Sequence, residues 1–339
     1  MRNLLFVTGG CGFIGSAFIR MVMAKTDFSI VNIDNLTYAA NLDALSTVSD
    51  GDRYFFSKTD ICSKEDISNL FNKYQPSGII NFAAETHVDN SINEPNIFLE
   101  TNVNGTFNLL NCSLRYFKNL PDEKKLNFRF LHVSTDEVFG SILLDENKSF
   151  DENSRYDPNS PYSASKAASD HFVSAWNTTY GLPTLITNCS NNFGAFQHEE
   201  KLIPKIIKNA LAQKSIPIYG DGSNIRDWIY VDDHVDGIFT VLNQGNVGQT
   251  YNIGSQNELS NISLVKKICK ILDELVPNNS IESYANLIQF VDDRLGHDEK
   301  YSINPKKIYD ELNWAPLVSF DEALRKTVSW YINHLNYEK

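Results

Sequence analysis

The sequence predicts an α/β fold: a Rossmann-like, doubly wound parallel sheet with a smaller, mainly α-helical C-terminal lobe. Two observations favour this fold. Over roughly the first 190 residues, short runs rich in β-branched and aromatic residues alternate with longer stretches of helical periodicity, which is the pattern of parallel strands joined by crossover helices. The glycine-rich run GGCGFIGS also follows the first apolar run directly, where such folds place a phosphate-binding turn.

The elements are expected in a regular order. Short apolar runs predict strands at residues 4–8, 29–34, 53–58, 78–84, 128–134 and 184–189. Helical periodicity predicts helices at residues 13–25, 63–74, 95–117 and 162–180. Beyond residue 190, loops rich in Asn, Gly and Pro surround one predicted helix at 201–212. A strand at 249–255 is expected to return to the main sheet, and the remainder indicates helices with loops.

The composition narrows the class of protein. The 339 residues include 42 acidic and 30 basic side chains, and the formal net charge is −12. Because no Lys/Arg-rich run is present, we expect neither nucleic acid nor a membrane surface as a partner. The five cysteines are far apart, without CxxC or Cys/His ligand spacing, so we expect reduced thiols, a cytoplasmic location and no metal site. The N-terminal apolar run is too short for a secretory or membrane-spanning segment.

The glycine-rich run suits a dinucleotide. Gly9, Gly12 and Gly15 permit a tight turn and let a diphosphate approach backbone N–H groups at the start of the next helix. The second predicted strand ends at Asp34, whose carboxylate can accept the hydroxyls of an adenosine ribose and would repel a 2′-phosphate. No arginine lies in IDNLTYAAN, so we expect NAD rather than NADP. For the glycines alone, an ordinary turn is the alternative.

Two further strand ends should border the same ligand. The third predicted strand is followed by Asp60 and Ile61, and the fourth ends near Ala83 and Ala84. In a doubly wound sheet, ligands lie across the carboxyl ends of the strands. We therefore expect these four residues beside the adenine and pyrophosphate of the cofactor.

A tyrosine and a lysine on one helix predict an oxidation. Tyr162 and Lys166 are four residues apart in PYSASKAASDH, so they lie on the same helix face. A nearby ammonium lowers the pKa of a phenol, and the resulting phenolate can take a proton from a carbinol during oxidation by a nicotinamide. Without a dinucleotide-binding loop in the same chain, such a pair often consists of two exposed side chains that have no catalytic role.

The end of the predicted strand at 128–134 carries additional acids. Thr135, Asp136 and Glu137 follow it directly, and the threonine should lie near the oxygen that Tyr162 deprotonates. An oxidation alone requires no further carboxyl groups. A base that removes a proton next to a carbonyl, together with an acid that expels a hydroxyl as water, describes an elimination. The alternative is a capping acid followed by a solvated acid at a helix start.

The chain resembles the nucleotide-sugar 4,6-dehydratases of the extended short-chain dehydrogenase/reductase group over nearly its whole length. The motifs that carry the resemblance are TGGCGFIGS, AAETHVDNSI, STDEVFG, PYSASKAASDH, NCSNNFGAFQ, KLIPKII, PIYGDGSNIRDWIYVDDH and DDRLGHDEKY. The resemblance implies that Thr135 positions the sugar 4-hydroxyl, that Tyr162 is its base and that Lys166 supports Tyr162 and the nicotinamide ribose. It also implies that Asp136 protonates the departing 6-hydroxyl and that Glu137 is the base at C5.

The resemblance also implies binding residues. The positions that match cofactor contacts of the family, in addition to the glycines and strand ends above, are Phe13, Ile14, Asn35, Thr101 and Asn192. The positions that match substrate contacts are Thr86, Thr135, Asn191, Lys201, Leu202, Pro217, Tyr219, Arg226, Asn261, Arg294 and His297. Guanidinium groups also suit a diphosphate in an otherwise acidic protein.

The length of the chain and the change of pattern after residue 190 predict two domains, and the resemblance implies a dimer. Residues 1–190 plus about 228–256 would bind NAD, and about 191–227 plus 257–339 would bind the nucleotide sugar. The helices at 95–117 and 162–180 would pair in a homodimer. Thymidine is the expected base of the substrate. Uridine is an alternative, because THVDNS also resembles eukaryotic UDP-glucose 4,6-dehydratases and because Asn90 stands where bacterial thymidylyl enzymes usually have Arg. A 4-epimerase would share the NAD loop and the Tyr/Lys pair but would not need Asp136 and Glu137.

Overall fold

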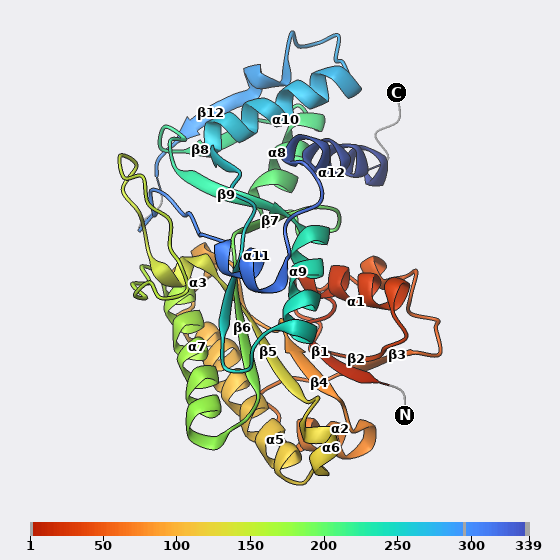
Figure 1. Ribbon diagram of the computed structural model, residues 1–339. Helices are drawn as coiled ribbons and strands as arrows, with labels where there is room; N and C mark the ends of the chain where they lie inside the picture. The colour runs from red at the N-terminus through yellow and green to blue at the C-terminus, as the bar shows by residue number, and fades with distance from the viewer. Residues whose placement is uncertain (1–2, 294–295, 336–339) are drawn as a thin grey trace.

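A seven-stranded parallel sheet forms the centre of the larger lobe (Figure 1). The computed structural model describes residues 3–293 and 296–335. The strands lie in the order β10, β6, β5, β4, β1, β2, β3. Their bounds are β1 (Leu4–Thr8), β2 (Ser29–Asp34), β3 (Tyr54–Lys58), β4 (Gly78–Asn81), β5 (Arg129–Thr135), β6 (Thr184–Cys189) and β10 (Thr250–Ile253). The order reverses between β1 and β4, so the crevice at their carboxyl ends is the expected ligand site.

Helices cover both faces of this sheet. One face carries α1 (Phe13–Lys25) and α9 (Val231–Gln244), which pack on each other, with α11 (Lys306–Leu312) beside them. The other face carries α2 (Lys64–Tyr74), α5 (Thr106–Lys118) and α7 (Pro161–Tyr180). The central strands β1, β2, β4, β5 and β6 are buried almost throughout, as expected for a parallel sheet covered on both sides.

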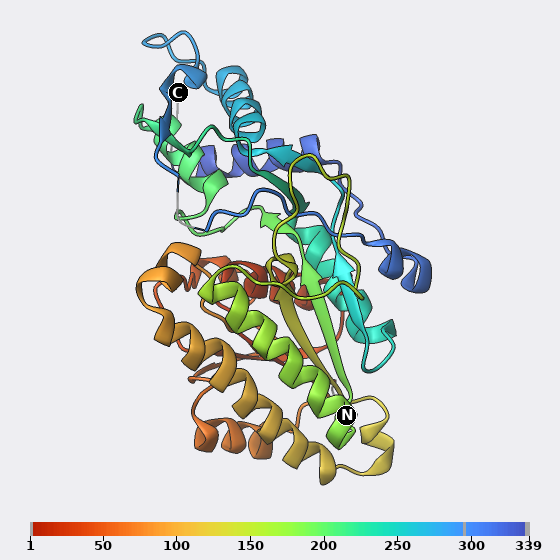
Figure 2. The same ribbon diagram turned by 90° about the vertical axis from the view of Figure 1, so that its left-hand side faces the viewer.

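The smaller lobe has its own apolar core above the carboxyl edge of the sheet (Figures 1 and 2). Its helices are α8 (Leu202–Leu211), α10 (Asn261–Leu275) and α12 (Phe320–His334). Two small sheets accompany them: β8 (Ile216–Tyr219) pairs with β12 (Ile288–Val291), and β9 (Ile225–Tyr230) lies between β7 (Asn191–Phe193) and β11 (Glu258–Ser260).

Short elements complete the described chain. They are α3 (Val88–Asn93), α4 (Pro95–Phe98), a π-helix (Leu99–Gly105), α6 (Asp122–Lys125) and three 3₁₀ turns (Asp43–Leu45, Asp136–Phe139 and Tyr284–Leu287). Within the described parts of the chain, no helix has both the length and the apolar character needed to cross a membrane.

The structure confirms the α/β class and most of the predicted elements. The strands predicted at 4–8, 29–34 and 184–189 and the helix at 13–25 agree residue for residue, and the strand predicted at 249–255 does return to the main sheet, beside β6. Between residues 190 and 249 the sequence predicted one helix among loops, but β7, β8, β9 and α9 also lie there. Three further expectations were wrong in part. Strand β4 ends at Asn81, the helix expected at 95–117 is divided by the π-helix, and the last segment contains β11 and β12 as well as helices. The domain boundaries stay a prediction.

Candidate active site

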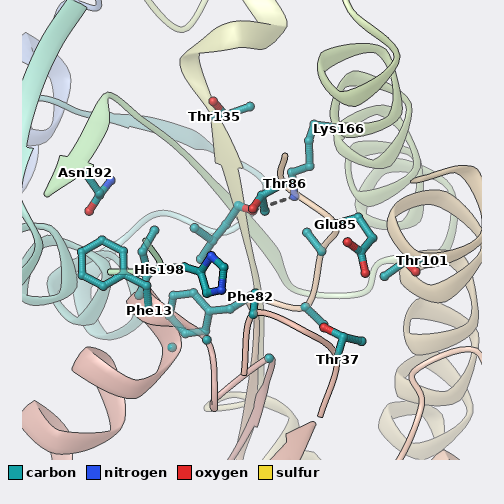
Figure 3. Close-up of a pocket in the computed structure, with 18 of the residues that line it drawn as sticks. Phe13, Thr37, Phe82, Glu85, Thr86, Thr101, Thr135, Lys166, Asn192 and His198 are labelled. Carbon is teal, nitrogen blue, oxygen red and sulfur yellow. Dashed lines mark hydrogen bonds between the residues drawn. The ribbon is translucent and has the colours of Figure 1, made fainter. Parts of the chain in front are cut away.

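A deep cleft runs along the carboxyl ends of the central strands (Figure 3). It encloses about 1630 Å³ of empty space, part of it continuous with solvent. It is lined by every residue predicted to bind the cofactor, namely Gly9, Gly12, Phe13, Ile14, Gly15, Asp34, Asn35, Asp60, Ile61, Ala83, Ala84, Thr101, Tyr162, Lys166 and Asn192.

The glycine turn between β1 and α1 fits a diphosphate. Gly9 has a positive φ of 66°, and a Cβ on Gly15 would lie 2.3 Å from the Gly9 carbonyl oxygen, so the turn requires glycine at both positions. Gly12 caps α1 without a side-chain hydrogen bond, and the first turn of α1 contains no acidic residue. The N–H groups at this helix start are therefore suited to a bound anion.

The acidic end of β2 is fixed by the backbone of two loops. Asp34 accepts hydrogen bonds from the N–H groups of Cys11 at 2.9 Å and Leu36 at 2.8 Å. Burial raises the pKa of its carboxyl, and these two bonds oppose the rise. Asn35 donates to Asp60 at 3.2 Å, joining the ends of β2 and β3. The arrangement presents a carboxylate beside the glycine turn, as required for recognition of a ribose.

The end of β5 places the three predicted catalytic residues in the same cleft. Thr135 is the N-cap of a 3₁₀ turn, and its hydroxyl accepts a hydrogen bond from the Glu137 N–H at 3.3 Å. The turn directs the two acids differently: Asp136 is 2% exposed, whereas Glu137 is only partly buried. Burial, followed by the charges of Glu137 and Asp227, raises the pKa of Asp136 well above its usual range.

Helix α7 brings Tyr162 and Lys166 to the cleft. The helix starts with a capping box between Ser160 and Ser163 and has Pro161 at its first position, a strong start signal. Lys166 donates to the Val133 carbonyl oxygen at 2.9 Å. Burial and then the Glu137 charge raise the pKa of Tyr162 above its ordinary value. The pKa lowering expected from the Tyr/Lys spacing is therefore not the dominant effect, because burial of the phenol outweighs it.

The predicted substrate residues fall into two groups. Thr86, Asn191 and Lys201 line the cleft with Thr135, and Lys201 donates to the Thr86 carbonyl oxygen at 3.0 Å. The second group lies in the smaller lobe outside the cleft lining and consists of Leu202, Pro217, Tyr219, Arg226, Asn261 and His297. Arg294 is outside the described residues. The roles of both groups in substrate binding stay predictions.

Arg226 has a buried position in this second group. Its guanidinium donates to the carbonyl oxygens of Ile225 at 2.7 Å and Asp298 at 2.9 Å, and it lies 4.2 Å from the centre of the Tyr301 ring. Its charge also opposes the rise in the pKa of Asp136. Arg226 therefore connects the segment around residues 298–301 with the acid at the end of β5.

Several residues of the cleft were not predicted from the sequence. Those in loops are Thr37, Ala39, Ala40, Thr59, Glu85, Gln197, His198 and Glu200. Nδ1 of His198 lies 3.5 Å from Oε2 of Glu200, and the His198 ring packs edge-on against the Tyr38 ring. The loop after β7 therefore meets the loop after β2 across the cleft. These residues stand in loops without regular periodicity, and no spacing rule identifies them.

The fold and this site define an extended short-chain dehydrogenase/reductase, because the glycine turn and the Tyr/Lys helix meet at the switch point of a doubly wound sheet. A family model described as GDP-mannose 4,6 dehydratase matches residues 6–327. The chain belongs to this family of nucleotide-sugar dehydratases.

Individual relatives are similar over almost the whole chain. A dTDP-glucose 4,6-dehydratase of Haemophilus influenzae is 52% identical over 334 residues, covering 98% of each chain. The crystal structure of DesIV, a dTDP-glucose 4,6-dehydratase from Streptomyces venezuelae with NAD and TYD bound, has a TM-score of 0.88 and 41% identity, covering 99% of each chain. The corresponding enzyme of Bacillus anthracis in complex with NAD has a TM-score of 0.86 and 38% identity, covering 99% of this chain and 98% of that one.

Proposed function

We propose that this chain is a dTDP-glucose 4,6-dehydratase, a hydro-lyase that forms the 4-keto-6-deoxy sugar with NAD recycled in each turnover. The observation that carries the proposal is the meeting of Thr135, Asp136 and Glu137 with Tyr162 and Lys166 in one cleft. Relatives about 50% identical over nearly the whole chain are dTDP-glucose 4,6-dehydratases, which supports the same reaction.

The residues of the cleft fit NAD. The glycine turn would receive the diphosphate at the start of α1, and Asp34 would receive the ribose hydroxyls. When bound, NAD supplies a reversible two-electron oxidation of the sugar, so that no external oxidant is consumed. The structures of relatives with NAD bound support this assignment.

Tyr162 and Thr135 act on the 4-hydroxyl of the sugar. Tyr162 accepts the proton of this hydroxyl as C4 is oxidised to a ketone, and Thr135 holds the same oxygen. Burial keeps the phenol of Tyr162 protonated in this structure, and a hydrogen bond with Thr135 opposes that effect. The Lys166 ammonium favours the phenolate when substrate and cofactor have replaced water around it.

Asp136 and Glu137 divide the elimination between them. Asp136 is buried beside another carboxylate, and both effects raise its pKa, which favours the protonated form that can donate a proton to the departing 6-hydroxyl. Glu137 is partly exposed and removes the C5 proton, which the new C4 ketone has made acidic. The 4-epimerase alternative needs neither group. Different surroundings thus give two adjacent carboxyl groups opposite roles.

We place the protein in the cytoplasm as a homodimer. None of the five cysteines forms a disulfide, which agrees with a reducing compartment. Helices α5 and α7 lie side by side on one outer surface (Figure 2), where Phe107 is 41% exposed and Tyr180 is 48% exposed. Burial of this surface against a second copy would support the dimer.

Product formation tests the proposed function. The purified protein is incubated separately with dTDP-glucose and UDP-glucose, and the alkali-induced absorbance of a 4-keto-6-deoxy sugar is recorded. We expect this absorbance with dTDP-glucose, and much less with UDP-glucose. Equal rates with both substrates would contradict the assigned base, and absence of product from both would refute the dehydratase.

A further inference from the structure

Two buried polar side chains that do not line the cleft lie close to Lys166. Its Nζ lies 3.3 Å from Nε2 of His132 on β5, and the same Nε2 lies 3.4 Å from Oδ1 of Asp170 on α7. The exposed fractions are 4% for Lys166, 1% for His132 and 1% for Asp170. The spacing of four residues places Asp170 one helical turn beyond Lys166.

We propose that Asp170 and His132 are positioning residues for the oxidation: Asp170 is the counter-ion of the buried Lys166 ammonium, and His132 orients the Asp170 carboxylate. The proposal rests on the function proposed above, because Lys166 then acts on Tyr162. It adds two residues that do not line the cleft and that act through the lysine.

The hydrogen-bond network determines which nitrogen of His132 carries the proton. Thr8 Oγ1 donates to Asn81 Oδ1 at 2.6 Å, so the Asn81 amide nitrogen is left to donate to Thr106 at 3.2 Å and to His132 Nδ1 at 3.0 Å. Since Nδ1 accepts a hydrogen bond, the proton of the neutral ring lies on Nε2. That N–H group lies 3.4 Å from Asp170 Oδ1, a buried oxygen for which no hydrogen bond is found among the described residues, so Nε2–H is the donor available to this carboxylate.

The second oxygen of Asp170 is also fixed. Its Oδ2 accepts hydrogen bonds from Ser134 Oγ at 2.7 Å and from the Tyr156 hydroxyl at 3.0 Å. Donors on β5 and in the loop before α7 therefore hold the carboxylate with one oxygen toward His132. An acid held in this way is prepared to serve as a fixed negative charge.

The charges of this cluster are consistent with the geometry. Burial raises the pKa of Asp170 to about 6, and the Lys166 charge opposes the rise, so the carboxylate is ionised at neutral pH. Burial, followed by the Lys166 charge, lowers the pKa of His132 well below its usual value, so the ring is neutral. Burial lowers the pKa of Lys166, and the Asp170 charge opposes that effect. The other titratable groups near the lysine are Tyr162 on α7 and Cys189 on β6.

The variant Asp170→Asn tests the counter-ion. It keeps the size of the side chain and one oxygen acceptor but removes the charge, so the Lys166 ammonium should lose its proton at lower pH. We expect kcat for dTDP-glucose to fall about 10- to 100-fold with KM changed less than about 2-fold. The alkaline limb of the kcat profile should move to lower pH by about one unit.

Tyr156→Phe is the matched control. It removes one hydrogen bond from Asp170 while the carboxylate charge remains, so the alkaline limb should keep its position. If Asp170→Asn leaves the alkaline limb and kcat of the wild-type protein unchanged, Asp170 is not the counter-ion. A rise in KM with unchanged kcat would also overturn the proposal.

An independent measurement requires no substrate. NMR of isotope-labelled histidine in the wild-type protein should show His132 with a proton on Nε2 and none on Nδ1, without titration between about pH 6 and 9. A doubly protonated ring, or a proton on Nδ1, would contradict the proposed arrangement. Because this result does not depend on the reaction, it separates failure of the cluster from failure of the proposed function.

Discussion

Asp136 and Glu137 are adjacent in the chain but lie in different surroundings. The 3₁₀ turn that Thr135 caps buries the first acid and leaves the second partly exposed. A buried carboxyl beside another negative charge retains its proton, whereas a partly solvated carboxyl releases it. A single local turn at the end of β5 thus provides both an acid and a base.

The first prediction separates elimination from oxidation. Asp136→Asn and Glu137→Gln should still allow the cofactor to be reduced by dTDP-glucose, seen as nicotinamide absorbance, but should slow formation of the keto sugar about 10²- to 10⁴-fold. Glu65→Gln, an exposed acid on α2, is the control and should retain normal rates. If either variant forms the final product at the wild-type rate, that residue has been assigned the wrong role.

The second prediction concerns stability as a function of pH. The pKa of Asp136 is raised in the folded state, so above about pH 4 the folded protein binds more protons at this residue than the unfolded chain. The free energy of unfolding therefore decreases as pH rises, and Asp136→Asn removes this contribution. In thermal unfolding, the Tm of the variant relative to wild type should increase from pH 4 to pH 8. A difference that does not vary with pH would show that Asp136 is not buried as an acid.

At the scale of elements, the turn from β1 into α1 controls cofactor binding. In Gly15→Ala the new Cβ would lie 2.3 Å from the Gly9 carbonyl oxygen, which forces the turn apart. We expect the NAD content of the purified protein to fall at least about 10-fold, measured after heat release. Gly51→Ala, in a loop remote from the cleft, should keep its NAD. Full NAD occupancy of Gly15→Ala would show that this turn is not the diphosphate site.

The elements that the sequence predicts well are those with continuous local signals. Strands β1, β2 and β6 are short apolar runs, and buried parallel strands have this pattern. Strands β8, β11 and β12 have three or four residues each and are partly exposed, so their pairing comes from tertiary contacts that no local pattern contains. Helix α9 was missed although Asp232 and Asp233 give it an acidic first turn.

Residues of the candidate site were likewise predictable only where a local sequence spacing identifies them. The glycines, Asp34 and the Tyr/Lys pair follow fixed spacings that correspond to one turn, one strand and one helix face, and all of them line the cleft. Asp170 could have been found, because it repeats the helical spacing beyond Lys166. His198 and Glu200 could not be predicted, because their approach to Tyr38 depends on how two distant loops fold across the cleft.

For the whole molecule, the outer surface of α5 and α7 predicts a dimer. Phe107, Phe172 and Trp176 form an aromatic cluster there, with ring centroids 5.4 to 6.0 Å apart. Phe107→Glu should shift the protein from dimer to monomer in light scattering, because a charge in the centre of an apolar interface is strongly unfavourable. Leu126→Glu, at the exposed end of α6, is the control and should leave the mass unchanged. A wild-type monomer would rule out this dimer.

The central claim is that one cleft performs oxidation, water loss and reduction on a single sugar. The most direct test uses dTDP-glucose labelled with deuterium at C4 and follows the label in the product by NMR and mass spectrometry. If the sugar stays bound between the two redox steps, the deuterium of C4 should appear in the C6 methyl group of the 4-keto-6-deoxy product. Deuterium that remains at C4 of an epimerised sugar, or that is lost to solvent, would contradict the account.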